Sequence, residues 1–543
     1  MKPAALVALV LAAAPAHAMD DGSLAQLVRQ RLDGDRTGTC MAVAVVEKTH
    51  VSRTFQCADP AEAGRIGPDV AFEIGSVSKT MTATLLADLV QQGKGSLDDT
   101  LASWLPEGTK VPEFQGQPIL LRHVVTHTSG LPALPSRGMD LTRMDDPYAG
   151  LDAESLLASL ADVQLDGAPG SRFAYSNYAS MLLSYAVARR AGTDLETLLQ
   201  QRLFAPLGMD RAYINRRPDG VREAKAHGSS GKEVPAWRFA TDLAGVGGVH
   251  ATLDDMVRYV QGGLAPGDTP VARAMAMTHV PVSQTPPMGM NWMIAPAGDR
   301  RLLVHEGATG GFSSLVMLDP EQQRGVVILS DTNWISIGGL ASLGNHLAEP
   351  SLPLGKPRRA ATPEPALLQA LAGDYQVQGA MKMSLRSRDG TLFLQPAGQP
   401  EYEMAYDDAG DFYPRDFDAV LRPAKRADGT YGFTWMQAGA VLPAVRIEPR
   451  AAFPQPSPAE LAAYAGTYPL MPGFDLSVRE EGGRMVAQAT GQGPVALEAV
   501  AKDRFEAAAF GAEFRFLRGA NGEVEAVELH QAGRVLRGQR QAQ

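Results

Sequence analysis

The chain has 543 residues and a formal net charge of −10, with 50 lysines and arginines against 60 aspartates and glutamates. Its basic residues are dispersed rather than clustered, which argues against nucleic acid as a partner. The length alone favours three or four domains.

The N-terminus has the features of a secretory signal peptide. Lys2 precedes an apolar run at residues 4–14, and Ala16-His-Ala18 fits a signal-peptidase site. We expect cleavage after Ala18 and a periplasmic or secreted protein. No cysteine follows the cut to carry a lipid, and no later apolar run is long enough to span a bilayer, so no membrane anchor is expected after processing. The alternative is a short anchor that is left in place.

The two cysteines, Cys40 and Cys57, flank a pair of strand-like runs. If Lys48-Thr49 forms a two-residue turn, Glu47 faces His50, and counting outward places Cys40 opposite Cys57. Alternation makes this a non-hydrogen-bonded pair with Cα atoms about 4.5 Å apart, which a disulfide can bridge. An oxidising compartment would allow the bond, so we predict it, although a longer turn would shift the register.

A serine and a lysine three residues apart, Ser76 and Lys79, open a long helical pattern that Gly93 ends. Residues at this spacing share a helix face, so the lysine amine is expected beside the serine hydroxyl. A serine hydroxyl needs an activating base, and lysine can serve only if burial or a nearby cation removes its charge. We predict Ser76 as nucleophile and a neutral Lys79. The structural alternative is a capping serine with a solvated lysine.

Tyr175 and Asn177 lie where a loop enters another helical pattern, at residues 178–191. A neighbouring lysine could favour the Tyr175 phenolate, or the phenol could simply relay a proton. Asn177 can hydrogen-bond both the lysine and a substrate amide. The structural alternatives are a packed tyrosine ring and an asparagine that caps the following helix.

Two strand-like runs joined by a glycine-rich turn follow at residues 301–318, and the first contains His305 and Gly307. Small residues on a strand edge let backbone amides approach a carbonyl closely. We expect this strand to hold the substrate, and the amides of Ser76 and Ala308 to form an oxyanion hole. The histidine spacing does not fit a zinc motif, and we expect neither metal nor cofactor.

These motifs resemble those of the class C β-lactamase and penicillin-binding-protein superfamily of serine hydrolases over residues 20–347. Further matching segments are residues 121–132, 206–209 and 244–255. The resemblance implies an α+β fold, the α/β sandwich of β-lactamases and transpeptidases, and an acyl-enzyme on Ser76. It also implies that Lys79 and Tyr175 handle protons and that Asn177 orients them.

The motif at His305 departs from the members that destroy β-lactams, which usually carry Lys-Thr-Gly there. A lysine offers a permanent cation to a substrate carboxylate, whereas histidine is mostly neutral at pH 7, and Glu306 would repel an anion if it faced the cleft. The His-x-Gly form is similar to that of D-aminopeptidases and related esterases. We expect hydrolysis of small amides, peptides or esters, above all of D-peptides. The alternatives are a class C-type β-lactamase, a DD-carboxypeptidase and a non-catalytic penicillin-recognising protein.

A proline-rich segment at residues 349–365 separates this region from a duplicated C-terminal part. Gly373 and Tyr375 recur as Gly466 and Tyr468, and nine such matches share an offset of 93 residues. A gapless match argues for two copies of one small domain. Asp-Gly and Asn-Gly dipeptides between short alternating runs predict that each copy is an antiparallel, lipocalin-like β-barrel of about eight strands.

The predicted organisation is a signal peptide at 1–18, a serine hydrolase domain at 19–350, and two barrels at 351–450 and 451–543. This order is similar to that of the three-domain bacterial D-aminopeptidases. The expected partner is a small molecule or short peptide that serves as substrate, and an oligomer is compatible with the sequence.

Overall fold

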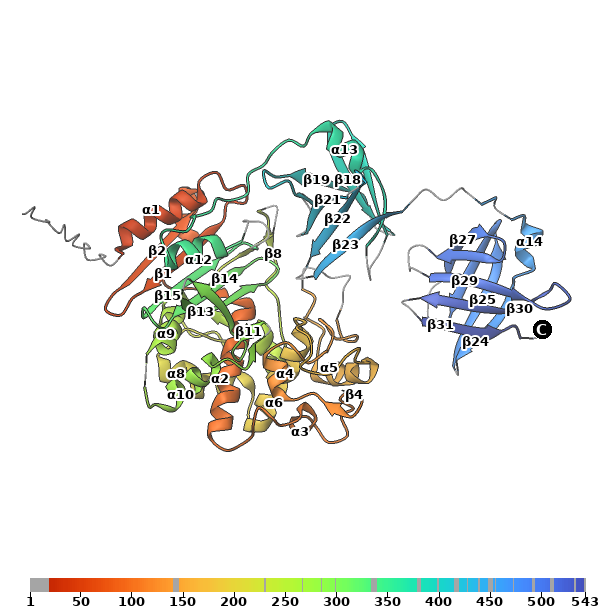
Figure 1. The fold of residues 1–543 in the computed structure, drawn as a ribbon. Coiled ribbons are helices and arrows are strands. Elements are labelled where there is room, and N and C mark those ends of the chain that lie inside the picture. Colours follow the sequence, from red (N-terminus) through yellow and green to blue (C-terminus); the bar gives the residue numbers. More distant parts are fainter. Residues whose placement is uncertain are drawn as a thin grey trace, which may run out of the picture. The chain divides into compact units, whose positions relative to one another are not determined.

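The chain falls into two compact units, with the border between Arg359 and Ala360 (Figure 1). The computed structural model describes residues 19–541 except 140–145, 229–230, 266, 285, 298, 334–338, 378–381, 398–399, 415–418, 427, 438–439, 448–452, 455, 472, 491–493, 508–511 and 532–533. The predicted signal peptide and most of the predicted border between the barrels therefore lie outside the described residues. None of the described helices combines the length and the apolar character that a bilayer span requires.

An eight-stranded antiparallel sheet is the centre of the N-terminal unit. Its strands lie in the order β10-β11-β12-β13-β14-β15-β1-β2. Their bounds in that order are Ser283–Gln284, Pro287–Met288, Met293–Ala297, Arg300–Ala308, Ser313–Asp319, Arg324–Ser330, Cys40–Val46 and Val51–Cys57. The first strand of the chain thus pairs with the last strand of this unit, with Met41 opposite Ser330.

Helices cover both faces of this sheet, which makes a three-layer sandwich (Figure 1). One face carries α1 (Asp21–Leu32) and α12 (Ala341–Ala348), and the other carries α2 (Ser78–Gln91), α6 (Asn177–Ala191), α9 (Leu253–Leu264) and α10 (Pro270–His279). Strand β1 is buried along its whole length because its side chains alternate between the two faces: Ala42 packs with the α2 side, and Val43 with the α1 side.

Shorter elements complete the unit. A small sheet joins β3 (Val70–Glu73) to β6 (Arg222–Glu223) and to β9 (His250–Ala251). The remaining strands are β4 (Glu113–Phe114), β5 (Gln117–Pro118), β7 (Ala226–His227) and β8 (Glu233–Val234), and the remaining helices are α3 (Leu101–Trp104), α4 (Leu121–Val125), α5 (Ala153–Ala158), α7 (Leu195–Leu199) and α8 (Ala205–Leu207). Short 3-10 helices lie at Pro60–Arg65, Gly75–Val77, Ser159–Asp162 and Thr241–Val246, and a π-helical segment at Gln200–Phe204 joins α7 to α8.

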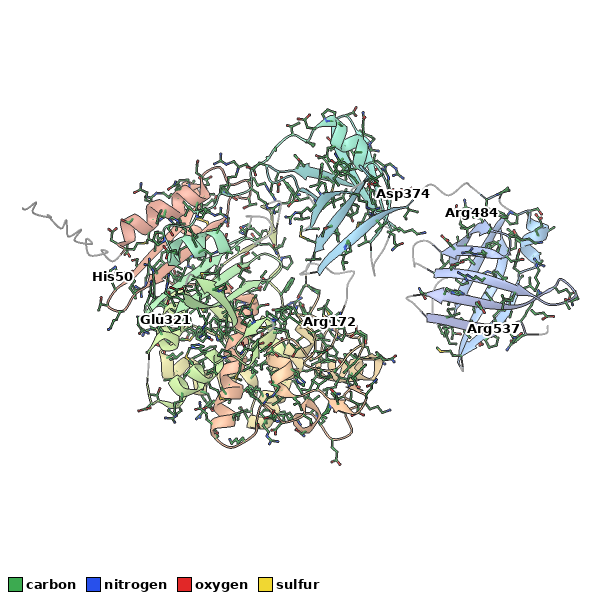
Figure 2. All side chains as sticks on the ribbon, in the orientation of Figure 1. His50, Arg172, Glu321, Asp374, Arg484 and Arg537 are labelled. Atoms are coloured by element: carbon green, nitrogen blue, oxygen red, sulfur yellow. A yellow bond between two sulfur atoms is a disulfide. The ribbon has the colours of Figure 1, made fainter. Side chains whose placement is uncertain are left out.

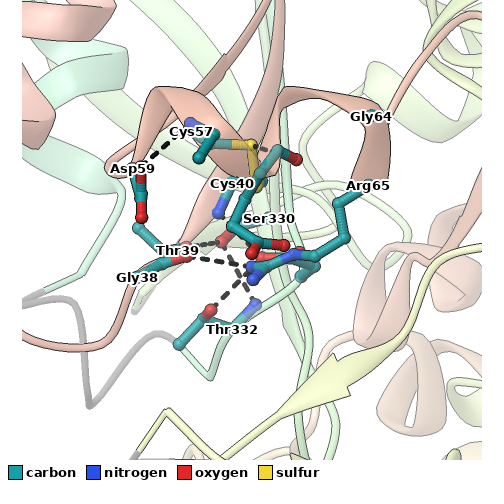
Figure 3. Close-up of a disulfide and its surroundings, with 12 residues drawn as sticks. Gly38, Thr39, Cys40, Cys57, Asp59, Gly64, Arg65, Ser330 and Thr332 are labelled. Atoms are coloured by element: carbon teal, nitrogen blue, oxygen red, sulfur yellow. Dashed lines mark hydrogen bonds and ion pairs between the residues drawn. A yellow bond between two sulfur atoms is a disulfide. The ribbon is translucent and has the colours of Figure 1, made fainter.

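The hairpin of β1 and β2 has the register that the two-residue turn requires. The Glu47 N–H donates to the His50 carbonyl at 2.8 Å, and Cys40 lies opposite Cys57 (Figure 2 labels His50). The two cysteines are joined by a disulfide, with their Cα atoms 3.9 Å apart (Figure 3). Beside it, Arg65 forms an ion pair with the fully buried Asp331, which also accepts the Cys40 N–H at 2.8 Å.

The C-terminal unit contains two successive eight-stranded antiparallel sheets, the first a closed barrel. Strands β16 to β23 are Gly373–Val377, Lys382–Arg388, Thr391–Pro396, Tyr402–Tyr406, Phe412–Pro414, Val420–Lys425, Tyr431–Gln437 and Ala440–Ile447. Strands β24 to β31 are Gly466–Met471, Phe474–Glu481, Arg484–Ala489, Val495–Ala501, Arg504–Ala507, Ala512–Arg518, Val524–Gln531 and Arg534–Gln539. A short helix precedes each sheet, α13 (Pro365–Leu371) and α14 (Pro458–Ala462). The predicted α+β sandwich followed by two antiparallel barrels is confirmed.

The two barrels share a structural device as well as an offset. The Tyr375 hydroxyl donates to the Leu371 carbonyl at 2.8 Å, and Tyr468 makes the equivalent bond to Tyr464 at 2.7 Å. Next to each tyrosine, a glycine leaves room for an arginine from the last strand. A Cβ on Gly373 would lie 2.7 Å from the Arg446 guanidinium, and one on Gly466 would lie 2.9 Å from that of Arg540.

Candidate active site

Ser76 lies in the single helical turn between β3 and α2, against the end of β13. Gly75 has a φ of 51°, and a Cβ there would lie 2.6 Å from the Ala308 nitrogen. A Cβ on Gly307 would lie 2.0 Å from the Ile74 carbonyl oxygen. Both glycines are therefore required for the backbone of β13 to come this close to the turn.

Lys79 projects from the first turn of α2 and reaches the Ser76 hydroxyl. Its Nζ lies 2.8 Å from Ser76 Oγ and 2.7 Å from the Val246 carbonyl oxygen. The residue is only 1% exposed, and this burial holds the pKa of Lys79 well below its usual range. A neutral amine can donate one N–H to the Val246 carbonyl and accept the Ser76 proton with its lone pair.

Tyr175 lies on the loop before α6, with its ring next to Lys79. Its hydroxyl is a hydrogen-bond partner of the Ser76 side chain, and the ring centroid is 5.1 Å from Lys79 Nζ. Although 41% of the residue is exposed, burial of the hydroxyl raises the pKa of Tyr175 well above its usual range. Of the two forms that the sequence left open, these surroundings favour the neutral phenol over the phenolate.

Asn177 is the first residue of α6, and its neighbour Ser176 is the cap. Ser176 Oγ accepts the Ala179 N–H at 2.9 Å, so the expected alternative of Asn177 as the cap is wrong. The Asn177 side-chain amide donates to the Tyr148 hydroxyl at 3.4 Å. Its carbonyl oxygen is buried and has no hydrogen-bond partner in the part of the chain that the structure describes. The expected bond to Lys79 is not formed, so the Asn177 oxygen is left for another donor.

His305 is buried on β13 and its tautomer is set by the backbone. Nδ1 lies 2.7 Å from the Glu306 carbonyl oxygen, which can only accept, so Nδ1 carries the hydrogen and Nε2 is left as an acceptor. Burial, followed by the proximity of Lys79, lowers the pKa of His305 to about 4. Glu306 has the opposite orientation on the strand: it lies opposite Leu315, which packs toward α1 and α12.

The end of β13 has an unpaired edge. Pairing with β12 stops at Val304, so residues 305–308 have no strand neighbour on that side among the described residues. The Thr309 N–H bonds across to the Phe312 carbonyl at 3.1 Å, and alternation then directs the Ala308 N–H to the open edge. The Ala308 and Ser76 amides therefore remain the candidate oxyanion donors.

An aromatic wall closes the other side of the site. Tyr148 stacks on Phe239 at 4.8 Å and packs against Trp237 at 5.2 Å. The wall and the nucleophile line a pocket that is open to solvent. Its lining residues are Ser76, Tyr148, Asn177, Trp237, Phe239, Val246, Gly247, Ala308 and Thr309.

Comparison with known proteins assigns the part of the chain that carries this site to a protein family. Residues 24–333, more than half of the chain, match the family model described as Beta-lactamase. The chain belongs to the β-lactamase family. A second match, to a domain of unknown function (DUF3471), covers residues 450–540 and so falls on the second barrel.

Relatives of this β-lactamase-family protein include peptidases. The D-alanyl-D-alanine-carboxypeptidase/endopeptidase AmpH of Escherichia coli strain K12 is 29% identical over 311 residues, which are 54% of this chain and 79% of that protein. Penicillin-binding protein 4* of Bacillus subtilis strain 168 is 22% identical over 425 residues, which are 73% of this chain and 92% of that protein. The protein is thus a serine hydrolase of the β-lactamase fold, related to β-lactamases and D-alanyl-D-alanine carboxypeptidases.

One solved structure matches nearly the whole chain. The octameric penicillin-binding protein homologue from Pyrococcus abyssi has a TM-score of 0.52 and 18% identity, and the match covers 96% of this chain and all of that one. At this identity the likeness shows the fold alone.

Sequence reasoning did not single out His127 of this β-lactamase-family site, which it included only within residues 121–132. The His127 ring packs on the Tyr175 ring at 4.2 Å, and its Nδ1 accepts the Ser176 N–H at 3.3 Å. Nε2 must then carry the hydrogen, and it is buried without a hydrogen-bond partner. Burial, then the proximity of Lys79 and His305, holds the pKa of His127 well below its usual range. The feature that distinguishes His127 is its left-handed backbone, with a φ of 53°. The sequence alone does not show this feature.

The aromatic wall was also missed, because Tyr148 and Trp237 lie in segments without a regular pattern. No group of three histidine, cysteine, aspartate or glutamate side chains able to hold a metal occurs among the described residues.

Proposed function

We propose that the protein hydrolyses small amide, peptide or ester substrates through an acyl-enzyme on Ser76, with a preference of the D-aminopeptidase type. The observation that supports this most directly is the buried Lys79 amine, 2.8 Å from the Ser76 hydroxyl. A fully solvated lysine would be charged and could not accept a proton, whereas this one is desolvated.

In the proposed acylation step, Ser76 Oγ attacks the substrate carbonyl carbon and its proton passes to Lys79 Nζ. The carbonyl oxygen becomes an oxyanion that the Ser76 and Ala308 amides bind. The bond to the leaving group then breaks, and the leaving nitrogen or oxygen takes the proton from Lys79 through the neutral Tyr175 phenol. In deacylation, water attacks the acyl carbonyl carbon and its proton passes through the Tyr175 phenol to Lys79 Nζ. The bond to Ser76 Oγ then breaks, the product acid leaves, and Ser76 Oγ takes the proton back from Lys79.

His305 is the basis for the proposed substrate preference. A neutral imidazole with an Nε2 acceptor favours a donor, such as a substrate ammonium or amide N–H, over a carboxylate. Glu306 lies on the other face of β13, so it does not account for rejection of an anion, contrary to the suggestion from the sequence. The preference against carboxylate-bearing β-lactams therefore depends on His305 alone.

Two alternatives have specific support. The name of the Escherichia coli relative favours a DD-carboxypeptidase or endopeptidase, and family membership favours a β-lactamase. A non-catalytic penicillin-recognising protein is disfavoured because Ser76, Lys79 and Tyr175 are all present and in contact.

A substrate panel tests the proposal. D-alanine p-nitroanilide, a D-Ala-D-Ala peptide, nitrocefin and p-nitrophenyl acetate are compared on the wild type and on Ser76→Ala. We expect the anilide and the ester to be hydrolysed best, and Ser76→Ala to lose all turnover above background. Wild-type rates in Ser76→Ala would refute the assignment of Ser76 as the nucleophile. If nitrocefin were hydrolysed best of the four substrates, the role given to His305 would be refuted.

A second variant tests His305 directly. His305→Lys introduces a cation at the position where the β-lactam-hydrolysing relatives usually have one, and we expect KM for nitrocefin to fall while KM for D-alanine p-nitroanilide rises. Unchanged KM values for both substrates would mean that this residue does not line the substrate site.

We also propose export to the periplasm or the medium, with cleavage after Ala18. N-terminal sequencing of the protein recovered from a bacterial periplasm should start at Met19. A start at Met1 would contradict the predicted signal peptide.

A further inference from the structure

The segment that carries the aromatic wall is held by two carboxyl groups. The Trp237 N–H donates to Glu73 Oε1 at 2.9 Å, and the next amide, that of Arg238, donates to Asp146 Oδ1 at 3.0 Å. The Arg238 side chain also donates to Asp146 Oδ2 at 2.8 Å. Both acidic side chains are buried, being 1% and 2% exposed. Two consecutive backbone amides of one loop are thus fixed from inside the protein.

Each carboxyl group belongs to a segment of the active site. Glu73 ends β3, three residues before Ser76. Asp146 precedes Tyr148 by two residues, and Tyr148 packs against Trp237. Thr309, the residue after Ala308, is a further neighbour of the Glu73 carboxyl. The nucleophile turn, the end of β13 and the aromatic wall therefore meet at this one side chain.

The surroundings of Glu73 do not balance a negative charge. In the part of the chain that the structure describes, no lysine or arginine forms an ion pair with Glu73, and Glu73 Oε2 is buried without a hydrogen-bond partner. The titratable groups that face it are His250 across the strand pair at 3.9 Å, Asp146, Glu223 and Tyr213. Burial lowers the pKa of His250, so it too is neutral. Burial raises the pKa of Glu73 to about 8.

We propose that Glu73 is a positioning residue for specificity: its carboxyl sets the distance between the aromatic wall and Ser76, and so determines which acyl groups fit. Asp146 holds the far side of the same loop. This inference rests on the proposed acyl transfer. Loss of the Glu73 contact frees the wall to move, which weakens binding of a bulky aromatic acyl group but not the attack on a small one. Ionisation of Glu73 has the same effect, because a buried carboxylate without a cation draws in water.

Two substitutions separate the hydrogen bond from the charge. Glu73→Met keeps the shape of the side chain and removes the acceptor for the Trp237 N–H. Glu73→Gln keeps an acceptor oxygen and cannot ionise. Glu223→Gln is the matched control, because it removes a nearby carboxylate that is half exposed and bonded to Tyr213.

The kinetic readout compares p-nitrophenyl acetate with p-nitrophenyl phenylacetate. For Glu73→Met we expect KM for the phenylacetate to rise about five- to tenfold, while kcat for the phenylacetate changes little. We expect kcat and KM for the acetate to change little as well. In the wild type, KM for the phenylacetate should rise as the pH passes 8, and in Glu73→Gln this rise should be absent. Equal losses on both esters in Glu73→Met would overturn the proposal. So would a rise in KM above pH 8 in Glu73→Gln that equals the rise in the wild type.

A spectroscopic readout does not depend on turnover. The fluorescence of Trp237, obtained as the difference between each protein and its Trp237→Phe version, should change between pH 7 and 9 in the wild type and in Glu223→Gln. It should stay constant in Glu73→Gln. A constant signal in the wild type would refute the positioning role, whereas an inactive protein with a pH-dependent signal would refute only the proposed function.

Discussion

Three buried nitrogen bases lie in the active site, and burial favours the neutral form of each. Lys79, His127 and His305 have lowered pKa values, chiefly because each is buried. The two histidines have opposite tautomers, since His127 presents an Nε2–H donor and His305 an Nε2 acceptor. The site can therefore exchange a proton with Ser76 without first removing a charge from any base.

The lowered pKa of Lys79 predicts the pH dependence of acylation. The neutral amine is the active form, so kcat/KM for p-nitrophenyl acetate should rise with pH through this lowered pKa and be level above it. Lys79→Arg should lose about a thousandfold or more, because a guanidinium cannot give up its proton. A Lys79→Arg variant within tenfold of the wild type would show that Lys79 is not the base.

His127 is predicted to position Tyr175. His127→Phe keeps the ring contact and removes Nδ1, so the Ser176 amide loses its acceptor. We expect kcat on the ester to fall about tenfold with KM unchanged. Phe173→Leu is the control, since Phe173 contacts the same imidazole at 6.1 Å but accepts no hydrogen bond. Equal effects of the two substitutions would indicate packing alone.

At the scale of elements, the decisive arrangement is the contact between the nucleophile turn and the end of β13. Gly75 and Gly307 allow the contact, and Ser314 Oγ strengthens it by donating to the Ile74 carbonyl at 2.7 Å. The same carbonyl would meet a Cβ on Gly307, so the strand cannot be moved away without breaking this bond.

Gly307→Ala should therefore be costly for both activity and stability. We expect kcat to fall at least a hundredfold, as for loss of an oxyanion donor, and the free energy of unfolding to fall by about 2 to 3 kcal/mol. Gly64→Ala is the control, because nothing lies within 4 Å of a Cβ there. Urea unfolding and ester kinetics on both variants provide the measurement, and a Gly307→Ala protein as active as the control would contradict the close contact.

The sequence predicts local arrangements here better than distant ones. The turn at Lys48-Thr49 and the register from Cys40 to Cys57 follow from alternation over a few residues. The sequence analysis considered only Asn177 as a helix cap, whereas the cap is Ser176. Both residue types cap well, and only the backbone angles decide between them. The stacking of His127 on Tyr175 joins residues 48 positions apart, and no periodicity within either segment reports such a contact.

For the whole molecule, we propose domain borders near residues 350 and 450. Limited proteolysis should cut first within residues 351–363, where proline-rich chain precedes α13, and leave fragments that begin with the first barrel. A first cut inside the N-terminal unit, at a site other than these residues, would contradict the border.

The disulfide is predicted to stabilise the N-terminal unit without a role in the reaction. The paired Cys40→Ala and Cys57→Ala substitutions should lower the free energy of unfolding by about 3 kcal/mol and leave kcat unchanged. Thiol labelling of the unreduced, denatured wild type should find no free cysteine, with the reduced protein as control. Full labelling at both positions would show that the bond is absent.

The pairing of β1 with β15 also bears on the order in which the chain can fold. Because Met41 pairs with Ser330, the central sheet cannot close until almost all of the N-terminal unit is available to fold. The hairpin of β1 and β2 needs only local contacts and, once its cysteines are oxidised, persists as a covalent loop. The hairpin of β1 and β2 can therefore form first, and β15 pairs with β1 afterwards.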